Sequence, residues 1–189
     1  NPFCSNLWGK SFVYLSNRKK MRLLTILKSI IIICGCFLIL SVDTPKENDS
    51  NKSKKMKIEI WSDVVCPWCY IGKTHFDRAL AQRPDHPFLI TWHPFQLNPE
   101  MPKEGVDRRA YLEGKFGGKT QAVAVYSRIA EAAQAAGIEL NLEGITRTPN
   151  TLDAHRLIHW AGIEKKQSQA VDALFAAYFL DGRDIGDTA

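Results

Sequence analysis

Two cysteines separated by two residues form the part of this chain whose types and spacing could do chemistry. They occur in "WSDVVCPWCYIGKTHF", residues 61–76, as Cys66-Pro67-Trp68-Cys69. Such a pair can bind a metal, close a structural disulfide, or exchange electrons with a substrate disulfide. No other cysteine occurs in residues 56–189, so the chemistry of that part of the chain depends on this pair.

The spacing argues against a metal site and against a purely structural disulfide. A four-ligand zinc site usually needs a second Cys/His pair. His155 and His159 lie four residues apart and could supply one, but a lone pair of this kind is more often surface or core histidine. A disulfide across four residues removes little entropy from the unfolded chain. We therefore predict no bound metal and favour the redox interpretation.

The position of the pair supports redox chemistry. The alternating "KIEIW" predicts a strand over 58–61, and residues 67–82 read as a helix. Cys66 then lies at the helix N-terminus, and Pro67 suits the first helical position. The unpaired N–H groups and the helix dipole stabilise a thiolate on Cys66. Cys69 lies about one turn later, within reach of a disulfide, so Cys66 can attack a substrate and Cys69 can resolve the mixed disulfide.

Neighbouring residues tune this chemistry. Trp68 adds bulk without a positive charge, so its effect on Cys66 is steric or acts through desolvation. Asp63, if near the thiols, would oppose thiolate formation. A role for Asp63 as a strand-end or cap residue is equally compatible with the sequence.

The rest of residues 56–189 predicts one βαβ unit followed by helices. "PFLITWHPFQL" reads as a strand over 88–93, and about 15 residues between the two strands indicate a right-handed unit with parallel strands. Helices are expected over 107–116 and 120–136, and from an Asn150/Thr151 cap to Trp160. A last helix carries a core stripe at helical spacing: Val171, Leu174, Phe175, Tyr178 and Phe179.

Charge and alanine content divide the chain near residue 55. Residues 1–55 contain 10 Lys/Arg and 3 Asp/Glu, a net charge of +7, whereas residues 56–189 contain 15 and 17, a net charge of −2. The first part has no alanine and the second has 17. The body therefore has no cationic surplus of the kind that nucleic-acid binding requires, and we expect no nucleic-acid partner.

Residues 1–55 combine an apolar run with a polar linker. Residues 23–42 include only one charge, Lys28, behind the basic "RKKMR". A translated run of this kind would contact a membrane, and the charge bias favours an exported body. The alternative, that Met56 is the true start and the body is cytoplasmic, is equally open. On either view the predicted divisions are 1–55, a βαβ part over 56–100, and a helical part over 101–189.

Four stretches resemble one family in order along the chain: "KIEIWSDVVCPWCYIGK", "WHPFQLNPEMPKEG", "NTLDAHRLIHWA" and "YFLDGRDIGD". They are similar to the DsbA-like thioredoxin-fold oxidoreductases of the FrnE type. The resemblance implies an α/β, thioredoxin-like fold with a large helical insertion, with Cys66 as nucleophile and Cys69 as resolving thiol. It places Asn98 in a loop close to the motif. It also places "NTLDAHR", with Asn150, Thr151 and His155 as substrate-binding candidates, on the inserted helices.

After Pro149 the sequence departs from the pattern of the family that it resembles. Members of the family carry a cis-proline loop, two strands and a last helix after the insertion, and no proline follows Pro149 here. We therefore expect the C-terminal strands to be missing, leaving two strands with an unpaired apolar edge. Such a chain would be a fragment, poorly stable alone and weakly active.

The predicted function is thiol–disulfide exchange with protein or small-molecule disulfides. It needs no bound cofactor beyond the Cys66–Cys69 disulfide, with glutathione as a candidate co-substrate. Two alternatives remain. Kappa-class glutathione transferases and hydroxychromene-carboxylate isomerases share the architecture but usually carry serine in place of Cys66. The third hypothesis is a membrane-tethered peptide-binding module without redox turnover.

Overall fold

The computed structural model describes residues 39–43 and 55–187. The strands are β1 (Ile39–Asp43), β2 (Met56–Ser62), β3 (Phe88–Pro94), β4 (Val106–Asp107) and β5 (Arg147–Thr148). The helices are α2 (Pro67–Ala81), α3 (Arg108–Phe116), α4 (Lys119–Ala135), α5 (Leu152–Ile163) and α6 (Gln167–Phe179).

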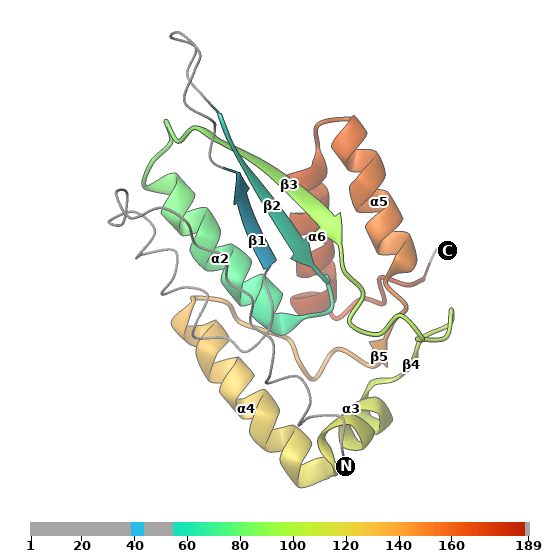
Figure 1. Ribbon diagram of the computed structural model, residues 1–189. Coiled ribbons are helices and arrows are strands. Elements are labelled where there is room, and N and C mark those ends of the chain that lie inside the picture. The colour runs from blue at the N-terminus through green and yellow to red at the C-terminus, as the bar shows by residue number, and fades with distance from the viewer. Residues whose placement is uncertain (1–38, 44–54, 188–189) are drawn as a thin grey trace, which may run out of the picture. The chain divides into compact units, whose positions relative to one another are not determined.

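A three-stranded sheet in the order β1-β2-β3 forms the centre of the fold (Figure 1). β2 pairs with β3 in parallel, with Ile58 opposite Ile90 and Ile60 opposite Trp92. Helix α2 connects these two strands, so the predicted βαβ unit is confirmed. The short strands β4 and β5 pair separately as an antiparallel two-stranded sheet.

The expectation of only two strands is wrong, although β3 remains at the edge of the sheet among the described residues. β1 pairs with β2 in antiparallel fashion, Ile39 opposite Trp61 and Asp43 opposite Lys57, so β2 has a partner on each side. These β1 residues include the last four of the apolar run 23–42. The remainder of that run and the linker residues 44–54 lie outside the described residues. Within the described ranges, no helix has the length and hydropathy needed to cross a bilayer.

One face of the sheet carries the core. Ile58 and Ile60 alternate with more exposed residues along β2, as the period-two pattern predicts. They join a cluster with Trp92 of β3 and the buried stripe of α6. Three of the stripe residues, Phe175, Tyr178 and Phe179, are completely buried, which confirms the predicted role of this helix. On the opposite face Trp61 stacks on His93 with ring centroids 4.6 Å apart.

Local signals explain where the helices begin and end. The Asp107 side chain accepts a hydrogen bond of 2.8 Å from the Ala110 N–H and so caps α3. Gly117, at φ 83°, ends the same helix in the left-handed conformation that glycine tolerates best. The predicted helices over 107–116 and 120–136 are thus confirmed within one residue at each end.

Helix α2 is held against α6 by a stacked ring and by a buried ammonium group. Tyr70 stacks on Phe175 with centroids 5.0 Å apart. One turn beyond Cys69, the Lys73 ammonium contacts the carboxylates of Asp77, at 2.5 Å, and Asp172 of α6. Burial alone would lower the pKa of Lys73, but the two carboxylates outweigh it and raise that pKa. The helix that carries the cysteines is therefore anchored to the helical part of the chain.

Candidate active site

Cys66 occupies the N-cap of α2, in an extended conformation with φ −90° and ψ 112°. Pro67 follows at the first helical position, where its missing N–H costs no intrahelical bond. The Cys66 carbonyl accepts the first bonds of the helix, from Cys69 N–H at 3.1 Å and Tyr70 N–H at 3.2 Å. The strand–turn–helix placement inferred from the sequence is therefore the one observed.

Both cysteines are buried, Cys66 at 2% and Cys69 at 5% relative exposure. Two physical effects on a thiolate at Cys66 therefore oppose each other. The helix N-terminus stabilises the anion, whereas removal from water destabilises it. Trp68 is partly buried and packs against both hydrophobic clusters of the described chain, so its bulk helps to shield this site.

Asp63 lies at the turn between β2 and α2 and is buried to 1% exposure. Its backbone carbonyl accepts a hydrogen bond of 3.0 Å from the Cys66 N–H. Its carboxylate oxygen Oδ2 accepts a second bond of 2.8 Å from the Leu97 N–H. Asp63 thus connects the cysteine turn to the loop that follows β3.

That loop also contains Asn98, which the resemblance placed near the motif. The Asn98 Oδ1 atom accepts a hydrogen bond of 2.6 Å from the Tyr111 hydroxyl of α3. The Tyr111 oxygen in turn accepts a bond of 2.9 Å from the Lys115 ammonium. Asn98 is therefore held within the protein by α3, and its role toward a substrate stays a prediction.

Asn150 ties the start of α5 to the same loop. Its Oδ1 atom accepts hydrogen bonds from Leu152 N–H at 2.9 Å and from Gln96 Nε2 at 3.3 Å. Its Nδ2 atom donates to the Met101 carbonyl at 2.6 Å. The predicted cap is thus provided by the Asn150 side chain, whereas Thr151 is buried at the N-cap position. All of these bonds serve the fold, and binding of a substrate by either residue stays a prediction.

His155 points into the protein rather than to a solvent-lined surface. It is 4% exposed, and its Nε2 atom lies 3.6 Å from Asp63 Oδ1. Both residues were candidates from the sequence, but their contact was not predicted. Gln96, Leu97 and Tyr111 were not predicted either, and no sequence signal marks Leu97, because its contribution is a backbone N–H.

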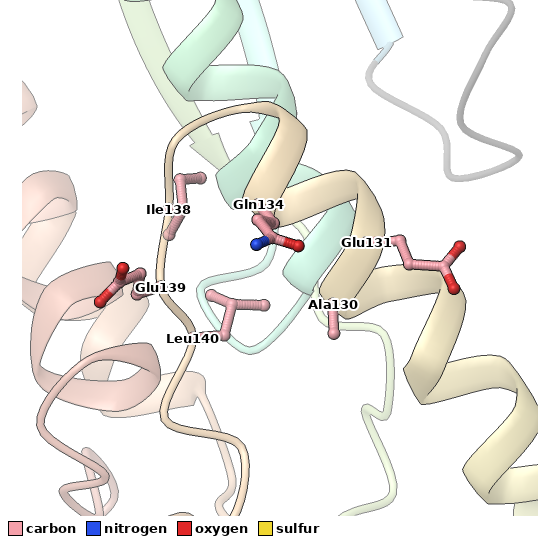
Figure 2. Close-up of a pocket in the computed structure, with 6 residues that line it drawn as sticks. All are labelled: Ala130, Glu131, Gln134, Ile138, Glu139 and Leu140. Atoms are coloured by element: carbon pink, nitrogen blue, oxygen red, sulfur yellow. The ribbon is translucent and has the colours of Figure 1, made fainter.

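No group of three or more His, Cys, Asp or Glu side chains within residues 39–43 and 55–187 is arranged to hold a metal ion. A hollow of about 260 Å³ lies between α4 and the segment that follows it. Figure 2 shows Gln134 and Leu140 in its middle, with Glu131 and Glu139 at opposite sides. Neither cysteine lines this hollow, so it is separate from the candidate active site.

The family model described as "DSBA-like thioredoxin domain" matches residues 57–189. The chain belongs to the DsbA-like thioredoxin family. Its fold is accordingly the thioredoxin-like DsbA fold, with the helices α3 to α6 following the βαβ unit. The predicted fold class is confirmed at this level.

The chain is also similar to two known proteins. A crystal structure described as a probable DsbA oxidoreductase from Streptomyces coelicolor matches with a TM-score of 0.60 and 33% sequence identity. The match covers 69% of this chain and 57% of that one. The uncharacterized protein YwbO of Bacillus subtilis (strain 168) is 28% identical over 130 residues, which are 69% of this chain and 60% of YwbO. The chain thus spans about three fifths of the length of these two similar proteins.

Proposed function

We propose that this chain exchanges a dithiol for a disulfide through Cys66 and Cys69. Membership of the DsbA-like family supports a thiol–disulfide oxidoreductase at the level of the family. The single observation that carries the proposal for this chain is the position of Cys66 at the N-cap of α2, with Cys69 in the first turn. We further propose that the chain is of the FrnE type, as its four sequence stretches suggest.

The exchange takes place in two balanced steps. The Cys66 thiolate attacks one sulfur of a substrate disulfide, forms a mixed disulfide, and releases the other sulfur as a thiolate. The Cys69 thiolate then attacks the Cys66 sulfur and releases the second substrate thiolate, leaving a Cys66–Cys69 disulfide. Two electrons pass from the chain to the substrate, and the reverse sequence oxidises a substrate dithiol.

Because both cysteines are buried, a substrate disulfide needs a way to reach the Cys66 sulfur. A substrate sulfur must come within bonding distance of the Cys66 sulfur along the line of the bond that breaks, and a residue at 2% exposure gives it little room. We propose that neighbouring side chains shift when a disulfide substrate binds. Trp68 is the candidate, because it lies between the two cysteines in sequence and is only partly buried.

The proposal is tested with insulin reduction by the full chain in the presence of dithiothreitol. Cys66→Ser should abolish turnover. Cys69→Ser, mixed with insulin in the absence of dithiothreitol, should complete only the first step and accumulate a mixed disulfide, visible by mass spectrometry of the unreduced protein. The matched control replaces Cys4, Cys34 and Cys36 with serine and should keep turnover at the level of the parent protein. Turnover that survives in Cys66→Ser would contradict the proposal.

A further inference from the structure

Two buried groups that can carry opposite charges face each other beside the cysteine turn. The Asp63 carboxylate and the His155 imidazole are 92 residues apart in sequence, yet Oδ1 and Nε2 lie 3.6 Å apart. Both residues are more than nine-tenths buried. Within the described part of the chain, neither Oδ1 nor Nε2 has a hydrogen-bond partner. Because an isolated buried charge is strongly disfavoured, the contact makes physical sense as a pair of opposite charges.

The surrounding contacts fix the direction of the carboxylate. Oδ2 accepts the Leu97 N–H, which leaves Oδ1 turned toward α5 and His155. The Asp63 backbone carbonyl binds the Cys66 N–H at 3.0 Å, so the carboxylate and the nucleophile belong to one hydrogen-bonded turn. The core cluster that contains Cys66 and Cys69 also contains Ala154, the residue before His155. Any net charge on this pair therefore acts close to the thiols.

Other charged groups on the elements packed around this turn either have partners of their own or, like Lys57 of β2 and His75 of α2, are exposed. On β2 and β3, Glu59 lies 3.3 Å from His93. On α2 and α6, Lys73 contacts both Asp77 and Asp172. On α5, Asp153 is bound by Arg156 at 2.6 Å, and the remaining histidine of that helix, His159, is exposed. His155 is the group that faces Asp63.

We infer that protonated His155 is the counter-charge of Asp63 and thereby keeps this buried carboxylate from opposing the thiolate at Cys66. His155 is a positioning residue in this scheme, because it acts on Cys66 through Asp63. The inference rests on the proposed role of Cys66 as nucleophile. It gives His155 a role other than the substrate binding that the resemblance implied. It also means that the effect of the Asp63 charge on the Cys66 thiolate depends on whether α5 places His155 beside it.

The scheme predicts a cancellation that simple structural support would not produce. Removing His155 alone leaves an unneutralised anion near the thiol and should raise the thiol pKa of Cys66. Removing Asp63 as well takes away the cause of that rise. The two substitutions should therefore compensate each other, whereas two losses of packing would add.

The experiment follows alkylation of Cys66 by iodoacetamide as a function of pH in the full chain. Cys69→Ser is the common background, and the Cys66 peptide is quantified by mass spectrometry, so the other cysteines do not interfere. In this background His155→Gln should shift the midpoint of the alkylation-rate curve of Cys66 upward by about one pH unit. The double variant with Asp63→Asn should return to within about 0.3 unit of the background, and Asp63→Asn alone should lie at or below it. His159→Gln, an exposed histidine one turn further along α5, is the matched control and should cause no shift.

An unchanged midpoint in His155→Gln would overturn the inference. An upward shift that persists in the double variant, or one that appears in Asp63→Asn alone, would also overturn it. If His155→Gln does not fold, the NMR signals of the His155 ring in the parent chain at pH 7 decide. The inference requires an imidazole that carries protons on both ring nitrogens, and a neutral imidazole would overturn it. Neither measurement requires turnover, so they fail independently of the insulin assay.

Discussion

At the scale of single residues, Arg108 at the start of α3 is a buried guanidinium in contact with two tyrosines. The Arg108 guanidinium carbon lies 5.0 Å from the Tyr126 ring centroid and 5.7 Å from that of Tyr178. Arg108 Nη1 donates a hydrogen bond of 2.8 Å to the Tyr178 hydroxyl, which donates to the Arg147 carbonyl at 3.3 Å. The helical spacing of apolar residues predicted Tyr178 as a core residue, but no sequence pattern marked the buried Arg108.

This burial makes a prediction about alkaline stability. Desolvation raises the pKa of Tyr178 to about 12, and the charge of Arg108 offsets only part of that rise. The folded state therefore holds this proton more tightly than the unfolded state, whose tyrosine titrates near pH 10. The contribution of Tyr178 is complete below pH 10 and is lost as the pH rises from about 10 to about 12, by roughly 2–3 kcal/mol.

Urea unfolding between pH 8 and pH 12 measures this effect. The free energy of unfolding should decline more steeply above pH 10 in the parent chain than in Tyr178→Phe. Burial also raises the pKa of Tyr126 and Tyr70, so the phenylalanine variant should keep part of the decline. Equal slopes in the two proteins would contradict the assignment to Tyr178.

At the scale of elements, the start of α5 shows how one side chain can position a whole helix. Asn150 binds the first N–H of the helix and two groups of the loop after β3. The same loop supplies the Leu97 N–H to Asp63. The placement of His155 relative to Asp63 therefore depends on how α5 is joined to this loop.

Asn150→Ala should lower the free energy of unfolding by about 1–3 kcal/mol, because the cap and the bond to the Met101 carbonyl are both lost. Asn150→Asp is the matched variant: it keeps the acceptor for the Leu152 N–H but replaces the donor to the Met101 carbonyl with an oxygen. The difference between the two variants therefore separates the cap from the bond to Met101. Urea unfolding followed by circular dichroism measures both. A raised KM for a disulfide substrate with unchanged stability would instead support substrate binding by Asn150.

At the scale of the whole molecule, a glutamine side chain joins the helical part to the sheet by hydrogen bonding to the backbone of β3, as a neighbouring strand would. Gln167, at the start of α6, accepts the Trp92 N–H at 2.8 Å and donates to the Trp92 carbonyl at 3.0 Å. Together with the stacking of Tyr70 on Phe175, this contact fastens α6 to both β3 and α2. The helical residues and the βαβ unit therefore share one core.

Gln167→Ala should lower the free energy of unfolding by about 1–3 kcal/mol, because two backbone groups of β3 lose their partners. Gln169→Ala changes the same residue type on the same helix at an exposed position, and it should stay within about 0.5 kcal/mol of the parent. Thermal and urea unfolding of both variants provide the comparison. Equal stability of the two variants would show that the amide pairing with Trp92 contributes nothing.

The sequence alone determined the features that depend on neighbours along the chain. Alternation in "KIEIW", Pro67 after Cys66, and the spacing of apolar residues in α6 each act within a few residues, so the strand, the helix start and the core stripe could all be predicted. The placement of Cys66 at the N-cap of α2 is of this kind, because Pro67 at the first helical position marks where the helix begins.

Only the tertiary structure decided which distant groups meet. The pairing of β1 with β2, the bonds of Asn150 to the loop after β3, and the contact of Asp63 with His155 join parts of the chain that packing brings together. A periodic pattern can show that a residue faces the interior, but it does not contain the identity of the group opposite. For that reason the two cysteines could be identified from the sequence, whereas the partner of Asp63 beside them could not.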